Sequence, residues 1–180
     1  CALTIASPAH ADATIDCNEN LGADGIAGTG DDPIRTTECG IGAIALGQDA
    51  TAIGFDARAG DEATAVGRNS RALGISDTAI GRSAVATGSQ SVALGFGASA
   101  IGNTTTALGV GTDAIGERSV AGGAFSTTIG DFSTAYGFDS RATGLQSIAI
   151  GSESRANAER SVAIGAQATT SAANSVALGY

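Results

Sequence analysis

The sequence predicts an all-β protein, a parallel β-roll or solenoid with about 14 residues in each coil. The first observation is a repeat, because Ser-Ile-Ala-Ile-Gly at 147–151 returns as Ser-Val-Ala-Ile-Gly at 161–165 and as Ser-Val-Ala-Leu-Gly at 175–179. The second is a glycine at intervals of seven from Gly40 onward. Self-similarity at a fixed period means that each repeat buries its surface by stacking on its neighbours. Function must therefore be sought on a stack of coils.

Composition excludes several functions. The 180 residues contain 5 Phe, 2 Tyr and no Trp or Met, so a core of large side chains cannot form. The net charge of -9 argues against nucleic-acid binding, which needs clustered positive charge. All 9 basic residues are Arg, and the lack of Lys excludes a P-loop lysine and Schiff-base catalysis.

Residues 1–11 end in Ala-His-Ala and have the small, uncharged character of the last part of a secretory signal peptide. We expect cleavage before Asp12; an ordinary strand and a lipidated Cys1 are the alternatives. Cleavage would remove His10, the single histidine, and with it histidine-dependent catalysis or metal binding. The sequence has no apolar run of about 18 residues, so we expect no membrane-spanning helix.

Residues 12–39 differ from the rest and predict an irregular, acidic N-terminal cap with seven of the 18 carboxylates. Cys17 and Cys39 bracket this segment, and a disulfide between them would stabilise an exported protein by about 3 kcal/mol in the chain-entropy model; two free thiols are the alternative. Asp24-Gly25 and Gly30-Asp31-Asp32 are similar to parts of calcium loops, but the full ligand spacing is not met.

The strict repeat begins at Gly40, with one short step between Gly54 and Gly60 and with Ala158 and Ala172 in place of glycine. A coiled coil is excluded, because a glycine in each heptad would cost about 1 kcal/mol and no large a/d pair is sustained. Hexapeptide and nonapeptide solenoids have other periods. Coils of strand, turn and strand remain, and residues 40–180 form the repeat domain.

Alternation along each heptad predicts which side chains point inward. The second residue before each glycine is almost always Ala, and the fourth is usually Ser, Thr or Ala. Since successive side chains of a strand point to opposite faces, these small residues share one face and form the interior of a thin roll.

The outward positions divide the heptads into two alternating kinds. In the first kind they are apolar or β-branched, and in the second they are often polar, as at Arg71, Asp113, Arg141, Arg155 and Thr169. About ten coils at ~4.8 Å would expose an apolar stripe of roughly 500 Å², near the limit for a soluble monomer. We therefore expect an oligomer interface, most simply in a closed homotrimer, although a dimer or a monomer with a mildly apolar side is not excluded by periodicity. The expected interface residues are Val92, Leu94, Leu108, Tyr136, Ile148, Ile150, Val162, Ile164, Val176 and Leu178.

These units closely resemble the YadA-like head repeats of trimeric autotransporter adhesins. The resemblance rests on Gln90–Gly95, Arg160–Gly165 and Asn174–Gly179, interleaved with Ser70–Gly74 and Ser140–Gly144, and it covers roughly residues 40–180. It implies a left-handed parallel β-roll, three chains to a head, and display on a bacterial surface fibre anchored in the outer membrane. It also implies adhesion to matrix proteins such as collagen or fibronectin, to host cells or to other bacteria.

The resemblance implies that N-S-V-A-I-G-x-x-S units take part in collagen binding, and Asn174–Gly179 matches the first part with Leu for Ile. On the opposite outward face, Arg71, Arg141 and Arg155 are the candidates for ligand contact, with protection against edge pairing as the alternative role.

Two other function classes remain. An enzyme is not expected, because the mature chain offers no histidine and no clustered carboxylates outside the cap, and no cofactor or metal site is expected in the repeats. An ice-binding or phage-fibre solenoid without an adhesive role also uses flat repetitive sheets, and a regular threonine ladder would favour the ice-binding alternative.

Overall fold

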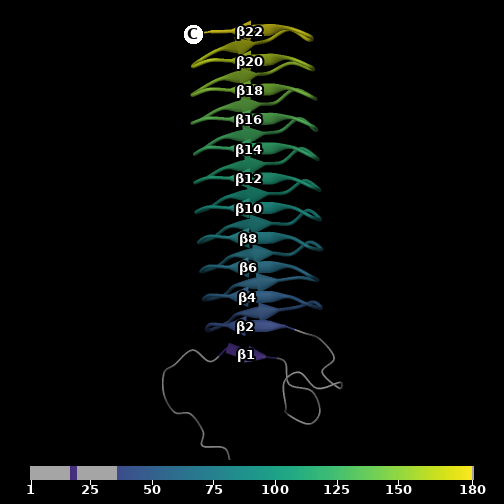
Figure 1. Cartoon of the computed structure of the whole chain (residues 1–180), viewed down its shortest axis with the longest axis vertical. Coiled ribbons are helices and arrows are strands. Elements are labelled where there is room, and N and C mark those ends of the chain that lie inside the picture. The colour runs from purple at the N-terminus through teal and green to yellow at the C-terminus, as the bar shows by residue number, and fades with distance from the viewer. Residues whose placement is uncertain (1–16, 20–35, 180) are drawn as a thin grey trace, which may run out of the picture.

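The computed structural model describes residues 17–19 and 36–179, which form a straight stack of β-coils. Two sheets lie face to face, and each coil contributes one strand to each sheet (Figure 1). Successive coils are neighbours along the whole stack, as the continuous colour change in Figure 1 shows. No helix occurs among the described residues.

The larger sheet has 12 strands in the order β1-β2-β4-β6-β8-β10-β12-β14-β16-β18-β20-β22, parallel except for β1. Their bounds are Cys17–Glu19, Thr37–Cys39, Thr51–Ile53, Thr64–Val66, Thr78–Ile80, Val92–Leu94, Thr106–Leu108, Val120–Gly122, Thr134–Tyr136, Ile148–Ile150, Val162–Ile164 and Val176–Leu178.

The smaller sheet has 10 parallel strands, which in chain order are β3, β5, β7, β9, β11, β13, β15, β17, β19 and β21. Their bounds are Ile44–Ala45, Arg58–Ala59, Arg71–Ala72, Val85–Ala86, Ser99–Ala100, Asp113–Ala114, Thr127–Thr128, Arg141–Ala142, Arg155–Ala156 and Thr169–Thr170. We call the turns that lead from the larger to the smaller sheet edge 1, and the turns that lead back edge 2.

The strand register confirms the coil length expected from the sequence. Val92 pairs with Thr106 and Ile148 pairs with Val162, a shift of 14 residues in each case. The exception is Thr51, which pairs with Thr64, so this coil is one residue shorter. The short step before Gly60 is absorbed in the turn, and the ladder on both sides remains in register.

The interior is built of small side chains, as the alternation predicts. Among residues 36–179, the buried apolar side chains are all alanines, and the buried polar ones are serines and threonines with the single exception of Asp77. Asp77 is fully buried, and its carboxylate accepts hydrogen bonds from Gly74 N at 2.8 Å and from Ser91 N and Oγ at 2.9 and 2.8 Å. A roll of this thickness has no room for larger apolar groups, so all of these lie outside.

Interior hydroxyls close the turns. Ser140 Oγ donates to the Gly137 carbonyl at 3.1 Å, and Ser154 Oγ donates to the Gly151 carbonyl at 3.0 Å. The same bond, from a hydroxyl to the carbonyl three residues earlier, recurs at Ser161, where the acceptor is Ala158 at 2.7 Å. Where a serine precedes the strand, its hydroxyl gives the turn carbonyl a second hydrogen bond; where Ala84 or Ala98 stands at this position, the carbonyl accepts the backbone N–H alone.

Glycine has a different role at each edge. At edge 1 the glycine that follows each parallel strand of the larger sheet has φ between +106° and +141°. Residues with a side chain rarely adopt this backbone conformation. At edge 2 the corresponding glycines do not have positive φ but lie directly on the backbone of the next coil. Both alanine replacements, Ala158 and Ala172, fall at edge 2, where only crowding opposes a Cβ.

The N-terminal end of the stack is closed by a polar residue. Glu38 occupies the column that holds Ala52 in the next coil, and its Oε1 accepts a hydrogen bond from Ala45 N at 2.6 Å. Strand β1 runs antiparallel to β2, with Cys17 opposite Cys39 in the register, and Cys39 is disulfide-bonded. A Cys17–Cys39 bond is compatible with this register and stays a prediction. The expected signal remnant at 1–11 and most of the expected cap lie outside the described residues.

We predict that Gly137→Ala destabilises the protein more than Gly144→Ala. At Gly137, with φ of 137°, a Cβ adds backbone strain of about 1–3 kcal/mol to contact with the Gly151 carbonyl. At Gly144 a Cβ would approach the Ala158 carbonyl even more closely, but the φ is not positive, and Ala158 and Ala172 show that edge 2 accommodates a Cβ. Thermal unfolding of the two variants checks this, and equal losses would contradict the assignment of separate roles to the two edges.

A second prediction concerns two serines in the same interior column. Ser147 Oγ is buried without a hydrogen-bond partner, whereas Ser161 Oγ is bonded. Ser147→Ala should therefore leave the free energy of unfolding unchanged or raise it, while Ser161→Ala should lower it by about 1 kcal/mol. Denaturant unfolding measures both, and a larger loss for Ser147→Ala would show that its hydroxyl is bonded in solution.

Candidate functional site

The thin interior leaves no enclosed site, so the candidate functional sites are the outer faces of the two sheets and the grooves beside them. No group of three or more His, Cys, Asp or Glu side chains that could hold a metal ion occurs in the described part of the chain. The acidic stretch that contains Asp24, Asp31 and Asp32 lies outside it. Within the same part of the chain, no helix is long and apolar enough to cross a membrane.

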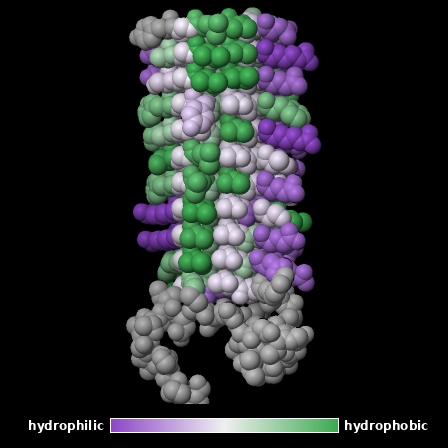
Figure 2. Space-filling view, viewed as in Figure 1, coloured by the Kyte–Doolittle hydropathy of each residue, from purple (hydrophilic) through white to green (hydrophobic). Residues whose placement is uncertain are grey.

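The outer face of the larger sheet carries an apolar stripe along its length (Figure 2). It is formed by the last residue of each strand, and Leu94, Leu108, Ile150 and Ile164 are between 36% and 44% exposed. Gly122 would interrupt the stripe, but the ring of Tyr136 from the next coil lies against it. The stripe is therefore continuous.

The neighbouring column on this face changes character along the stack. Its first four members are threonines paired in register, Thr37, Thr51, Thr64 and Thr78. Val92, Ile148 and Val162 follow further along, half-buried between their neighbours, and Val176 is 64% exposed. All ten residues expected at a subunit interface thus lie on one outward face. Their role in subunit contact stays a prediction.

The smaller sheet differs from the sequence-based expectation of a polar face. The column that begins each of its strands is mostly polar, with Arg58, Arg71, Asp113, Arg141 and Arg155 among its members. The column that follows each strand is mostly apolar in the first two-thirds of the stack, where Gly60 and Thr87 interrupt it, and is polar at the end. Its exposed apolar members are Leu46, Leu73, Ile101, Ile115 and Ile129. Apolar side chains accumulate here because no large side chain can enter the roll.

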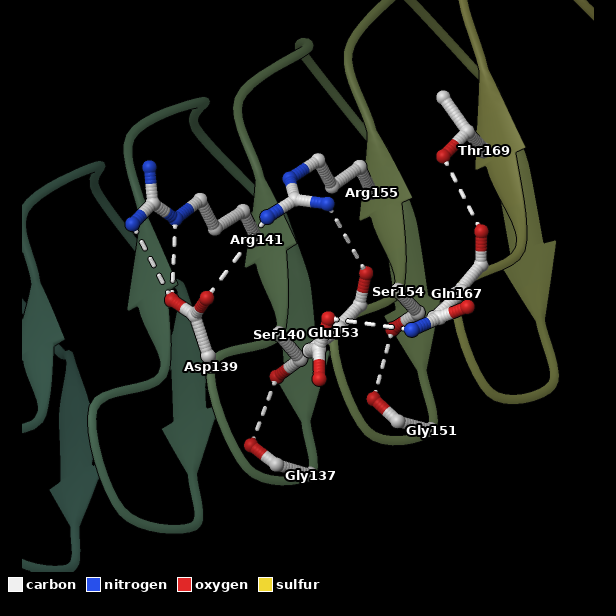
Figure 3. A network of polar contacts seen from close by, with 10 residues as sticks. All are labelled: Gly137, Asp139, Ser140, Arg141, Gly151, Glu153, Ser154, Arg155, Gln167 and Thr169. Carbon is white, nitrogen blue, oxygen red and sulfur yellow. Dashed lines mark hydrogen bonds and ion pairs between the residues drawn. The ribbon is translucent and has the colours of Figure 1, made fainter.

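Arg141 and Arg155 form a neutralised ladder near the C-terminal end. They pair in register on β17 and β19, and Asp139 lies between them (Figure 3). Asp139 Oδ1 accepts hydrogen bonds from Arg141 Nε at 3.2 Å and Nη2 at 3.1 Å, and Asp139 Oδ2 lies 3.6 Å from Arg155 Nη2. Glu153 is the second carboxylate, and its Oε2 accepts a hydrogen bond from Gln167 Nε2 at 3.3 Å.

Arg71, the third candidate for ligand contact, lies in a second arginine pair. It is in register with Arg58 on the adjacent strand, and the two line a groove of about 440 Å³ with Asp56, Asn69, Ser83 and Val85. Both guanidinium groups are exposed, and neither forms an ion pair or hydrogen bond with a described residue. The two arginine pairs therefore share a backbone arrangement and differ in charge balance.

Sequence reasoning missed Arg58 because of the short step. Counting back from Gly60 places Arg58 at an inward position and Ala59 at an outward one. The register instead pairs Arg58 with Arg71 and Ala59 with Ala72. The signal that could have found it is the dipeptide Arg-Ala, which stands at 58, 71, 141 and 155.

Comparisons with known proteins agree with this geometry. A family model described as the YadA head domain repeat, in two copies, matches residues 40–70, 59–84, 72–98, 100–126, 114–140, 129–154, 142–168 and 156–180. The crystal structure of the collagen-binding domain of the Yersinia adhesin YadA is similar, with 33% sequence identity over 77% of this chain and 70% of that chain and a TM-score of 0.56. A comparison with curated proteins finds no significant match.

The half-buried Asp113 gives a pH-dependent prediction. It stands between Ser99 and Thr127 in its column, and burial raises the pKa of its carboxyl above the ordinary 3.8, because desolvation disfavours the charged form. A raised folded-state pKa means that stability is lost as the pH rises through 3.8 and beyond. Asp113→Asn should therefore raise the free energy of unfolding at pH 7 by less than about 1 kcal/mol, which is seen as a higher melting temperature. Below about pH 3 the variant and the unchanged chain should have the same stability. Thermal unfolding at both pH values checks this; a variant less stable at pH 7 would contradict it.

Proposed function

The chain belongs to the family of YadA head domain repeats, and from this membership we propose that it forms the adhesive head of a trimeric adhesin on a bacterial surface, attaching to matrix proteins, cells or other bacteria. The observation that carries the proposal is the match of the repeats over most of the chain, together with a similarity to a collagen-binding domain that extends to the fold. Display on the outer membrane after export is part of the same proposal.

Three chains would cover the apolar stripe. A continuous line of exposed Leu, Ile and Tyr side chains along a whole face is unfavourable in water, and burying it between subunits would stabilise the assembly. The interior supplies little hydrophobic stabilisation, because it consists of Ala, Ser and Thr. Association through the larger sheet would therefore contribute much of the stability of the head.

Collagen is the matrix protein that the similar structure favours as a partner. A straight stack of equal coils presents the same outward positions at a regular spacing of about 4.8 Å, so a long fibrous partner can be contacted at many points. Many weak contacts along one ligand give high avidity without a deep pocket. Cell surfaces and other bacteria, which also present repeated ligands, suit the same arrangement.

Ice binding is the second candidate, and one observation bears on it. The threonine column of Thr37, Thr51, Thr64 and Thr78 is the ladder that such a function would use. In the following coils Thr106 and Thr134 alternate with Val92 and Val120, and from Ile148 onward the column is aliphatic. The uninterrupted threonine ladder covers four strands of the 12-stranded larger sheet and does not extend along the whole face. The observations therefore favour adhesion over ice binding.

The proposal predicts that Ile150→Glu combined with Ile164→Glu separates the subunits and weakens adhesion. Both side chains are about 40% exposed on the larger sheet, and a carboxylate at each would be buried against a sister chain. Sedimentation should show three subunits for the unchanged chain and fewer for the variant. Binding to immobilised fibrillar collagen should fall by at least about tenfold because avidity is lost.

Ile129→Glu is the matched control, because Ile129 is 51% exposed on the smaller sheet. It should leave the subunit number unchanged. Loss of trimers with Ile129→Glu, together with intact trimers in the double variant, would assign the interface to the wrong sheet. A trimer that binds no collagen, fibronectin, cells or bacteria but inhibits ice growth would replace adhesion with the second candidate.

A further inference from the structure

A groove near the N-terminal end of the stack has unpaired positive charge. It spans three neighbouring strands of the smaller sheet, β5, β7 and β9, over about 10 Å along the stack. Its volume is about 440 Å³, and Arg58 and Arg71 lie along it with Asp56 as the one acidic residue of the lining.

Arg58 and Arg71 extend from adjacent strands without an ion-pair partner among the described residues. Strand spacing places the backbones of Arg58 and Arg71 about 4.8 Å apart in a parallel pair, so their like charges repel. No carboxylate of a described residue pairs with either group. An anionic group in the groove could accept charge-assisted hydrogen bonds from both, and these are among the strongest in proteins.

The Arg141 and Arg155 ladder is an arginine pair on an equivalent backbone in which a carboxylate does pair with the arginines. Asp139 precedes Arg141 by two residues, as Asp56 precedes Arg58, so the first coil of each pair supplies one carboxylate. In the second coil, Glu153 precedes Arg155, whereas the corresponding residue before Arg71 is Asn69.

Counting these side chains, the C-terminal ladder has two positive and two negative charges, and the N-terminal pair has two positive charges and one negative. Asn69 in place of Glu153 is one difference between the two pairs. The other is that Asp139 forms ion pairs with both Arg141 and Arg155, whereas Asp56 forms none with Arg58 or Arg71.

Two further arginines extend the positive surface along edge 1. Arg68 lies over the ring of Phe55 at 5.6 Å, and Arg82 lies over the ring of Phe96 at 5.5 Å. These contacts hold the two neighbouring arginines without neutralising their charge. The nearby acids Asp61 and Glu62 belong to edge 2, on the opposite side of the coil. Four of the nine arginines thus gather in three successive coils beside one groove.

We propose that this groove binds an acidic polysaccharide through its sulfate or carboxylate groups. A linear chain with charges at regular intervals suits two guanidinium groups in line over a shallow groove. A peptide is disfavoured, because the backbone of these strands is already paired on both sides and Val85 is the one large apolar side chain of the lining. A single-stranded nucleic acid is disfavoured, because the residues that line the groove include no aromatic side chain on which a base could stack. The site is separate from the apolar stripe and does not depend on collagen binding.

The test measures binding of the whole chain to immobilised heparin in dilute salt. Arg58→Gln combined with Arg71→Gln should weaken binding by at least about tenfold. Asn69→Glu, which gives the groove the charge balance of the other ladder, should weaken it several-fold without removing an arginine. Arg141→Gln combined with Arg155→Gln is the matched control and should change binding by less than about twofold. Desulfated heparin separates the two anionic groups: retained binding assigns carboxylates, and lost binding assigns sulfates.

Each outcome decides the proposal. No binding of the unchanged chain to heparin, or equal losses from the two arginine pairs, would overturn the site. Equal affinity for single-stranded DNA or polyglutamate through the same residues would overturn the ligand class. Thermal unfolding shows whether each variant is folded. Collagen binding by the unchanged chain is measured in parallel, so failure of this proposal is distinguished from failure of the adhesive one.

Discussion

The narrow space between the two sheets determines the rest of the structure. In the described coils the interior holds Ala, Ser and Thr, with a hydrogen-bonded Asp77 and with Glu38 at the N-terminal end, so the chain cannot use its Leu, Ile, Phe and Tyr side chains to build a core. Those side chains lie outside on both sheets and at both edges. Stability must then come from the hydrogen-bonded ladder between coils and from whatever covers the outer faces, since burial of an alanine contributes little.

The same constraint separates the part of each coil that is fixed from the part that can vary. Inward positions must be small, and the glycine at edge 1 must adopt positive φ, so these positions repeat through the chain. Outward positions meet no such limit. In one column of the smaller sheet, Arg58, Val85, Asp113 and Thr169 occupy equivalent places on an unchanged backbone. Binding properties can therefore differ from coil to coil while the fold stays the same.

Much of the fold could be predicted from the sequence because the period of the repeat equals the number of residues in one coil. The spacing of the glycines gives the coil length, and the Ala and Ser positions give the inward face, both of which the structure confirms. The outward positions of the second kind of heptad are often polar, and the prediction was wrong where it took from this that the whole outer face of that sheet is polar. Leu73, Ile101 and Ile115 are exposed on that sheet. They belong to the column that follows each strand, whereas the prediction relied mainly on the polar residues that begin the strands.

The candidate site was less predictable for a related reason. A groove depends on which side chains lie beside each other in successive coils, and a shift of one residue changes every partner. The short step before Gly60 moved Arg58 out of the counted register, and only the strand pairing brings it beside Arg71. Whether an arginine is neutralised depends in turn on side-chain geometry, as at Asp139, and the spacing of residues does not give this.

The charge balance of both arginine pairs is set at turn positions that the backbone itself requires. Asp56, Asn69, Asp139 and Glu153 all have φ between +47° and +58°, a conformation unfavourable for residues with a side chain. Each donates its N–H to a carbonyl of the preceding coil, as Asn69 does to Phe55 at 2.8 Å and Glu153 does to Phe138 at 2.7 Å. The left-handed conformation thus continues the ladder around edge 1, and the hydrogen bond offsets its cost. Because the backbone holds this residue in the same place in every coil, exchanging its side chain changes the charge beside the neighbouring arginines and leaves the coil intact.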